Sequence, residues 1–216
     1  CGRSTGAQET WYLDQWADDL AVFCKSLGIG SPIVFGQSFG GMVAMHFAAR
    51  HPERLSKLIL SSTAAQFRLD ETVKKMRSLG GDHAAEVSHQ FFSNPSQGLY
   101  DTYGEVCLPL YSNPNASEAS AFRERAIERP EVALHFFADE MATMDMRAEI
   151  ANITCPTLVI GGTLDPVTPT LCSQVITDSI GENACLQMFE GCGHGPHRDD
   201  PDGAEKVMRH FLAAST

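Results

Sequence analysis

The sequence predicts an α/β fold in which a mostly parallel sheet is flanked by helices and carries a helical insertion. Three observations support this prediction. Near both ends of the 216-residue chain, short apolar runs alternate with segments whose apolar residues recur at helical spacing. These runs are almost continuously apolar, which is typical of parallel strands buried on both faces. The middle of the chain, about residues 65–150, shows only helical fragments.

The first part of the chain reads as two helix–strand pairs. Apolar residues recur every three or four positions in the first helix, and Gly28 and Gly30 end it. Pro52 stops the second helix, because proline cannot continue it. The predicted elements are, in order, a helix at Leu13–Leu27, a strand at Ile33–Phe35, a helix at Met42–Ala49 and a strand at Leu55–Thr63.

The alternation resumes after the middle region, where the helical fragments are Glu71–Leu79 and Glu131–Met141. The later elements are a strand at Cys155–Gly162, a helix at Thr170–Ile180, a strand at Ala184–Gly191 and a helix at Gly203–Ala213. Asp199 and Asp200, just before Pro201, are expected to cap the last helix. We therefore predict a core domain formed by residues 1–64 and 151–216, with residues 65–150 as a helical cap.

Composition restricts the function. The residues are 43% hydrophobic and 20% charged, enough apolar content for one domain with a substantial core. A formal net charge of −11 repels phosphate backbones and anionic lipid, so we expect no nucleic-acid or membrane partner. No apolar run reaches the roughly 18 residues that span a bilayer. The seven cysteines form no C-x-x-C pair, which indicates reduced thiols and a cytoplasmic protein.

The segment Gly36-Gln37-Ser38-Phe39-Gly40 places a serine between a predicted strand and a predicted helix. G-x-S-x-G at such a junction is typical of a nucleophile elbow, a sharp turn that holds a serine hydroxyl outside the sheet. We expect an unfavourable backbone conformation at Ser38, with glycines on both sides because side chains there would clash. The N–H of Phe39, at the helix N-terminus, would then face a developing oxyanion.

A serine hydroxyl is barely ionised at neutral pH, so it needs a general base, and the base needs an orienting acid. Asp165 follows the predicted strand that ends at Gly162, and His194 follows the last predicted strand. Elbow proteins have the chain order Ser, acid, His. Because the carboxyl ends of parallel strands meet at one edge, we expect Ser38, Asp165 and His194 to converge there.

Other interpretations of these residues stay open. Asp165 could cap the helix that follows it, and His197 could be the base instead of His194. Cys192 and the two histidines could suggest a metal site, but no second ligand cluster accompanies them. The prediction is therefore a site without metal or cofactor.

These segments together resemble the α/β-hydrolase superfamily, and within it the prolyl aminopeptidase (proline iminopeptidase) group. The likeness rests on "CGRSTG", "GQSFGGMVAMHFAARHPERLSKLILSST", "CPTLVIGGTLDPVTP" and "GCGHGPHRDDP". It covers residues 1–65 and 150–216, while the middle matches only as a helical cap. The resemblance implies that Ser38 is the nucleophile, Asp165 the orienting acid and His194 the base, with the Phe39 N–H as one oxyanion donor.

Members of the superfamily have several strands before the point that corresponds to Cys1. One of them ends in His-Gly and supplies the second oxyanion donor, and no segment of this sequence matches it. Without those strands, the strand at Ile33–Gly36 would have an open edge and part of the sheet would lack cover. We therefore expect a missing N-terminal segment or a companion chain.

Three functions fit these predictions. The first is an aminopeptidase that releases N-terminal proline from short peptides through an acyl-enzyme. Its substrate's ammonium group favours an acidic recess, for which Asp139 and Glu140 are candidates, and Gln37 is a further candidate substrate contact. The second is a carboxylesterase or lactonase that uses the same Ser-His-Asp triad on small-molecule substrates. The third is a non-catalytic, hydrolase-like protein that binds a small molecule.

Overall fold

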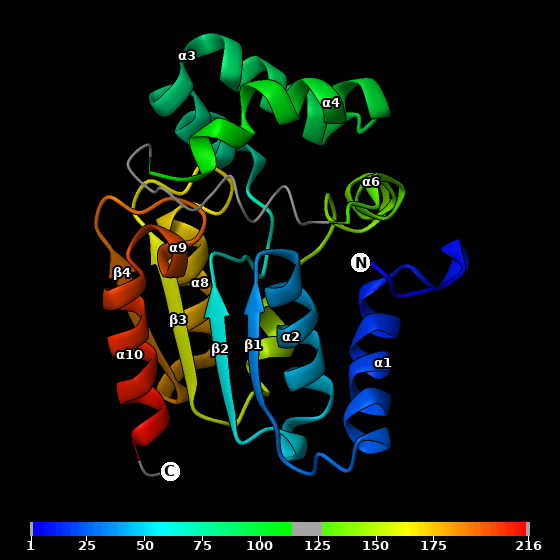
Figure 1. Cartoon of the computed structure of the whole chain (residues 1–216), viewed down its shortest axis with the longest axis vertical. Helices are drawn as coiled ribbons and strands as arrows, with labels where there is room; N and C mark the ends of the chain where they lie inside the picture. Colours follow the sequence, from blue (N-terminus) through cyan, green and yellow to red (C-terminus); the bar gives the residue numbers. More distant parts are fainter. Residues whose placement is uncertain (1, 114–126, 215–216) are drawn as a thin grey trace.

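The computed structural model describes residues 2–113 and 127–214 (Figure 1). Its centre is a four-stranded sheet in the order β1-β2-β3-β4, with every neighbouring pair parallel. The strands are β1 (Ile33–Gln37), β2 (Lys57–Ser61), β3 (Thr157–Gly162) and β4 (Ala184–Phe189). Their carboxyl ends therefore lie along one edge of the sheet, as predicted for a parallel arrangement.

The two central strands are buried along their whole length, which explains their continuous apolar sequence. Leu58 and Leu60 belong to the larger core, together with residues of the helices on one face. Ile59 points to the other face and packs with Leu158 and Ile160. Alternate side chains of each central strand thus fill two separate apolar layers.

Helices cover the two faces unequally. One face carries α1 (Leu13–Ser26), α2 (Phe39–Arg50), α7 (Arg147–Ile150) and α8 (Thr170–Ile180), whose buried side chains share the larger core. The opposite face carries α10 (Pro201–Ala213), which packs against the smaller core through Val207, Met208 and Phe211 (Figure 1). The buried Lys57 fastens the end of α10 by donating hydrogen bonds to the carbonyl oxygens of Phe211, Leu212 and Ala214.

The helices of the middle region lie above the carboxyl ends of the strands (Figure 1). They are α3 (Leu69–Ser93), α4 (Gln97–Val106) and α6 (Pro130–Asp139), with the 3-10 turn η3 (Leu108–Tyr111) after α4. The fragment predicted at Glu71–Leu79 is the first half of α3, which bends at Gly81, where φ is 76°. The short helix α7 packs against α2 and α8, so the chain returns to the core before residue 150.

Four short elements complete the described structure: η1 (Gln8–Thr10), η2 (Pro52–Arg54), η4 (Gly181–Asn183) and α9 (Pro196–Asp199). The α9 turn directly follows His194 and leads into α10. None of the helices in the described ranges combines the length and apolar content needed to cross a bilayer.

Strand β1 forms one edge of the described sheet and presents apolar side chains to solvent. Ile33 is 52% exposed and Phe35 is 45% exposed, because α10 covers the neighbouring strands but not β1. Further exposed apolar side chains on α1 and the loop before β1 are Val22, Phe23, Leu27 and Ile29. This is the edge at which the sequence leads us to expect an additional segment, and that expectation stays a prediction.

Candidate active site

Ser38 occupies a strained turn between β1 and α2. Its backbone angles are φ 52° and ψ −123°, a region that residues with a side chain rarely adopt. Hydrogen bonds hold the turn on both sides: Ser38 N donates to the carbonyl of Ser61, and the Ser38 carbonyl accepts from Gly41 N and Thr63 Oγ1. The expected strained conformation at this serine is therefore present.

The glycines around Ser38 have different reasons to be there. A Cβ atom at Gly36 would lie 2.5 Å from the carbonyl oxygen of Gly40, so a side chain there is excluded. A Cβ at Gly41 would lie 2.6 Å from Thr63. A Cβ at Gly40 would meet nothing within 4 Å. The prediction of crowding on both sides of Ser38 is thus wrong for Gly40, and the second close approach belongs to Gly41.

The structure brings the three predicted catalytic side chains together. Ser38 Oγ lies 2.9 Å from His194 Nε2. The other ring nitrogen, Nδ1, lies 3.0 and 2.9 Å from the two carboxylate oxygens of Asp165. Asp165 is fully buried and His194 is 5% exposed. The arrangement can pass a proton from the hydroxyl to an imidazole whose orientation the carboxylate fixes.

Asp165 is held in its ionised form by its surroundings. Burial by itself would raise its pKa, but the charge of a protonated His194 and the hydrogen bonds from His194 and Thr168 outweigh burial, so the pKa lies below its ordinary value. Its Oδ1 accepts from the backbone N–H groups of Val167 and Thr168, and its Oδ2 accepts from the Thr168 hydroxyl at 2.7 Å. Asp165 therefore stabilises the loop before α8 and, with the same carboxylate, contacts the imidazole of His194.

Hydrogen bonds hold the backbone of His194 at both its N–H and its carbonyl group. Its N–H donates to the Tyr111 carbonyl at 2.6 Å, and its own carbonyl accepts from Gln37 Nε2 at 2.7 Å and from Arg198 at 3.2 Å. The sequence makes Gln37 a candidate substrate contact. The structure instead turns its amide toward the histidine loop, so its position argues for a supporting role.

Other predicted residues lie apart from the Ser38 hydroxyl. The His197 ring packs edge-on against Phe35, and burial lowers its pKa. Asp200 caps α10 by accepting from Gly203 N, as predicted. Asp199 does not cap this helix, and its carboxylate accepts from Gly193 N instead. In residues 2–113 and 127–214, no three His, Cys, Asp or Glu side chains are grouped to hold a metal ion.

None of the cysteines in the described ranges contacts Ser38, Asp165 or His194 through the hydrogen bonds given above. Six cysteines fall within the described ranges, all of them are free thiols, and Cys1 lies outside these ranges. Burial raises the pKa of Cys192, two residues before His194, to about 11. This thiol is therefore protonated at neutral pH and is a poor nucleophile.

A cavity of about 220 Å³ opens beside Ser38 and is lined in part by α3, α4 and α6. Aromatic rings dominate its lining, among them Phe91, Phe136 and Phe137. Tyr103 and Tyr111 also line it, and their hydroxyl oxygens are 2.7 Å apart. Burial and the neighbouring Tyr111 raise the pKa of Tyr103 well above its ordinary value, so its hydroxyl stays neutral. None of the described side chains that line the cavity carries a formal charge.

The two candidate acidic residues do not reach this cavity. Glu140 Oε2 accepts a hydrogen bond from the backbone N–H of Leu13 at the start of α1, at 2.9 Å. Burial raises the pKa of Glu140. Asp139 is exposed at the last position of α6. The expectation that either carboxylate forms an acidic recess beside Ser38 is not supported by these positions.

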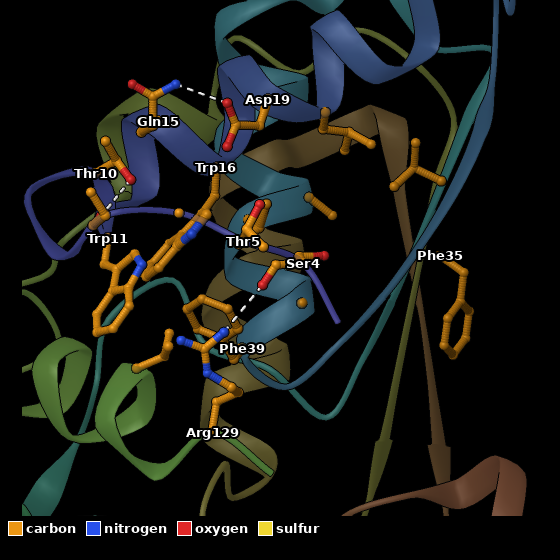
Figure 2. Close-up of a pocket in the computed structure, with 18 residues that line it drawn as sticks. Ser4, Thr5, Thr10, Trp11, Gln15, Trp16, Asp19, Phe35, Phe39 and Arg129 are labelled. Carbon is orange, nitrogen blue, oxygen red and sulfur yellow. Dashed lines mark hydrogen bonds between the residues drawn. The ribbon is translucent and has the colours of Figure 1, made fainter. Parts of the chain in front are cut away.

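A larger cavity, of about 720 Å³, shares Phe39 with the aromatic cavity (Figure 2). It is lined by the N-terminal loop, α1, β1 and the first two turns of α2, and by Arg129, whose guanidinium donates to the carbonyl of Ser4. None of Ser38, Asp165 and His194 lines it. Of these two cavities, only the smaller, aromatic one is lined by Ser38, while Phe39 borders both.

Comparisons with known proteins agree with this geometry. The family described as "Serine aminopeptidase, S33" matches residues 1–201. Strigolactone esterase D14 of Arabidopsis thaliana is 25% identical over 202 residues, covering 93% of this chain and 73% of that protein. A proline iminopeptidase of Clostridium botulinum is 26% identical over 229 residues, covering 98% and 77%.

Solved structures show the same fold. An α/β-fold hydrolase from Bacillus anthracis matches with a TM-score of 0.77 and 19% identity, covering 98% of this chain and 79% of that one. The prediction of a parallel α/β sheet with a helical insertion is confirmed by this likeness. With the family match over residues 1–201, the chain belongs to the serine aminopeptidase (S33) family of the α/β-hydrolase superfamily, and it is a hydrolase.

Proposed function

We propose that this protein is a serine carboxylic-ester hydrolase that forms an acyl-enzyme on Ser38. The observation that carries the proposal is the chain of contacts from Ser38 Oγ through His194 to the buried Asp165, with heavy-atom distances of 2.9 to 3.0 Å. Distances of this size allow direct proton transfer between a nucleophile and its base.

The mechanism follows from these contacts. As the Ser38 hydroxyl attacks the ester carbonyl, His194 Nε2 takes its proton, and Asp165 stabilises the imidazolium. The imidazolium then gives that proton to the departing alkoxide, which leaves as an alcohol. His194 next takes a proton from a water molecule that attacks the acyl-enzyme. The second tetrahedral intermediate then collapses: the bond from the acyl carbon to Ser38 Oγ breaks, the imidazolium of His194 returns the proton to Oγ, and the carboxylic acid is released.

The negative charge of each tetrahedral intermediate develops at the start of α2. Phe39 is the first residue of this helix, so its N–H belongs to the first turn, whose N–H groups have no partner within the helix. The helix dipole adds positive potential at the same point. We assign the Phe39 N–H as one oxyanion donor on this basis.

The lining of the aromatic cavity favours an ester over a peptide with a free amino terminus. An ammonium group buried there would find no carboxylate among the described lining residues, and such burial is costly. An apolar acyl or alcohol group would instead replace water against aromatic rings. We therefore place small esters with an apolar substituent first, and lactones of similar size within the same class.

An aminopeptidase acting on N-terminal proline is the second candidate. Two findings favour it: the matching family is described as a serine aminopeptidase, and a proline iminopeptidase is 26% identical to this chain. Both candidates use the same three residues and the same acyl-enzyme. They differ in the group that the cavity must accept.

The proposal is tested by a fluorophosphonate probe together with two substrates, an aryl ester of a short apolar acid and proline arylamide. We expect the native protein to react with the probe and to hydrolyse the ester. Ser38→Ala should lose labelling, and turnover should fall by about 10³-fold or more, as in other triads. The matched control is Ser78→Ala, at an exposed serine on α3.

The outcomes separate the alternatives. Hydrolysis of proline arylamide without ester hydrolysis would replace the ester proposal by the aminopeptidase. Absence of labelling and turnover in the native protein would reject both enzymes and favour the third function, a non-catalytic protein that binds a small molecule.

A further inference from the structure

The segment from the last residue of the 3-10 turn η3, Tyr111, to Asn113 runs against the loop that carries His194. The Tyr111 carbonyl accepts from His194 N at 2.6 Å. Asn113 Nδ2 donates to the carbonyl of Gly191 at 3.3 Å, and Asn113 N donates to Asp199 Oδ2 at 3.1 Å. Residues 111–113, which we call the strap, therefore contact the histidine loop before, at and after His194.

Asp199 joins the strap to this loop through a single oxygen atom. Its Oδ2 accepts both Gly193 N, at 2.7 Å, and Asn113 N, at 3.1 Å. The first of these donors immediately precedes His194, and the second lies in the strap. The carboxylate thus connects two segments that are about 80 residues apart in the chain.

The fit between strap and loop leaves no space for a side chain. A Cβ atom at Gly193 would lie 2.3 Å from the carbonyl oxygen of Tyr111. The same carbonyl accepts the His194 N–H, so the contact that excludes a side chain at Gly193 also sets the position of the histidine backbone. The Tyr111 ring lies edge-on to the imidazole, with ring centroids 5.0 Å apart.

Stability alone gives a weak reason for a carboxylate at position 199. Its Oδ1 is buried and accepts no hydrogen bond from the described residues. A buried oxygen without a partner is costly, and such groups in native structures call for another explanation. The orientation of the histidine loop supplies one, because Oδ2 receives the two N–H groups that join the loop and the strap.

We propose that Asp199 is a positioning residue for His194: its carboxylate fastens the strap, residues 111–113, to the histidine loop and so keeps the imidazole between Ser38 and Asp165. This inference rests on the proposed function. Asp199 touches none of the reacting atoms, and it acts on the reaction through the backbone on either side of Gly193. A small displacement of a catalytic group can lower a rate by up to about 10²-fold, which sets the scale of the expected effect.

The test compares Asp199→Ala, Asp199→Asn and Asp200→Ala. Asparagine keeps a side-chain oxygen that can accept both N–H groups, whereas alanine removes it. The matched control is Asp200→Ala, since Asp200 is the adjacent aspartate but caps α10. Each protein is assayed for ester hydrolysis and thermal stability, and the ring 15N chemical shifts of His194 are recorded, assigned by comparison with His194→Gln. These shifts report which ring nitrogen carries the proton, without turnover.

We expect Asp199→Ala to lower kcat by about 10- to 100-fold with a smaller change in KM, and to shift the His194 ring signals. In Asp199→Asn, both kcat and the His194 ring signals should be close to those of the native protein. Asp200→Ala should lower the melting temperature and leave kcat within about twofold of native. Should Asp199→Ala fail to fold, Asn113→Ala weakens the same connection by removing the bond to Gly191, and it should shift the ring signals in the same direction.

Native kcat and native ring signals in Asp199→Ala would overturn the inference. Equal losses of kcat in Asp199→Ala and Asp200→Ala would also overturn it, because they would reflect only the stability of the region. A native protein that hydrolyses no substrate, but whose His194 signals depend on Asp199, would count against the proposed function and leave the positioning role standing.

Discussion

The side-chain amide of Gln37 donates a hydrogen bond to the carbonyl oxygen of His194 over 2.7 Å. Gln37 immediately precedes Ser38, so this bond links the turn of the proposed nucleophile to the loop of the proposed base, His194. Arg198 NH1 approaches Gln37 Oε1 at 3.3 Å and orients the same amide. The side chains of Gln37 and Arg198 therefore help to hold His194 at its distance from Ser38, although neither of them bonds to Ser38 Oγ or His194 Nε2.

The first prediction concerns this link. Gln37→Ala should lower kcat by about tenfold with little change in KM, because the side chain positions the base and does not line the aromatic cavity. The measurement is steady-state ester hydrolysis. Gln97→Ala is the control, since Gln97 is an exposed glutamine at the start of α4 whose side chain donates to Asp101. A large rise in KM with native kcat would instead return Gln37 to its expected role as a substrate contact.

The second prediction concerns the size of the aromatic cavity. Phe137→Ala removes a ring from a space of about 220 Å³, so esters with a longer acyl chain should gain room. The ratio of kcat/KM for an octanoate ester to that for an acetate ester should rise by about tenfold. This factor is about 1.4 kcal/mol, the gain from burying about two further methylenes at about 0.8 kcal/mol each. Phe23→Ala, at an exposed ring on α1, should leave the ratio unchanged. No change in Phe137→Ala would place the substrate elsewhere.

The third prediction concerns acid stability. The pKa of Asp165 lies below its ordinary value, so the folded state binds fewer protons here than the unfolded state does. The resulting stabilisation is present above about pH 3.9, the ordinary pKa of an aspartate, and is lost as the pH falls through the folded-state value. The free energy of unfolding, measured in urea between about pH 3 and 7, should therefore fall more steeply on acidification in native protein than in Asp165→Asn.

The control for the third prediction is Asp202→Asn, at an exposed residue of α10. This variant should follow the native curve. Native and Asp165→Asn curves that run parallel through the acid range would show that Asp165 does not provide the pH dependence.

The fourth prediction concerns the end of α10. Lys57 is 7% exposed, and its ammonium group donates to three carbonyl oxygens at 2.7 to 3.0 Å. Lys57→Met keeps much of the volume but leaves these carbonyls without a donor, so the free energy of unfolding should fall by about 2–3 kcal/mol. Lys206→Met, on the exposed side of the same helix, should change it by less than about 0.5 kcal/mol. Equal losses in both variants would contradict this account.

The strands and the residues that follow them could be predicted from sequence because their signals are local. Continuous apolar runs marked β2 and β3, and chain order placed Asp165 and His194 just beyond strand ends. Parallel pairing then required the side chains to meet at one edge. The helix Thr170–Ile180 was also predicted with the bounds that the structure gives.

The support around His194 could not be predicted in this way, because it depends on contacts between distant segments. Nothing local to Asp199 distinguishes it from Asp200, yet one accepts from the histidine loop and the other caps a helix. Glu140 looked available for substrate because the sequence does not reveal that α1 begins beside it. A glutamine next to a nucleophile likewise gives no indication of which way its amide turns.

The strained backbone of Ser38 sets stability against activity at this position. A conformation at φ 52° and ψ −123° costs of the order of 1–3 kcal/mol for a residue with a side chain, and glycine escapes most of that cost. Ser38→Gly should therefore be inactive yet more stable than Ser38→Ala by about 1 kcal/mol. Selection for thermal tolerance alone would tend to replace Ser38, and only simultaneous selection for turnover would keep it.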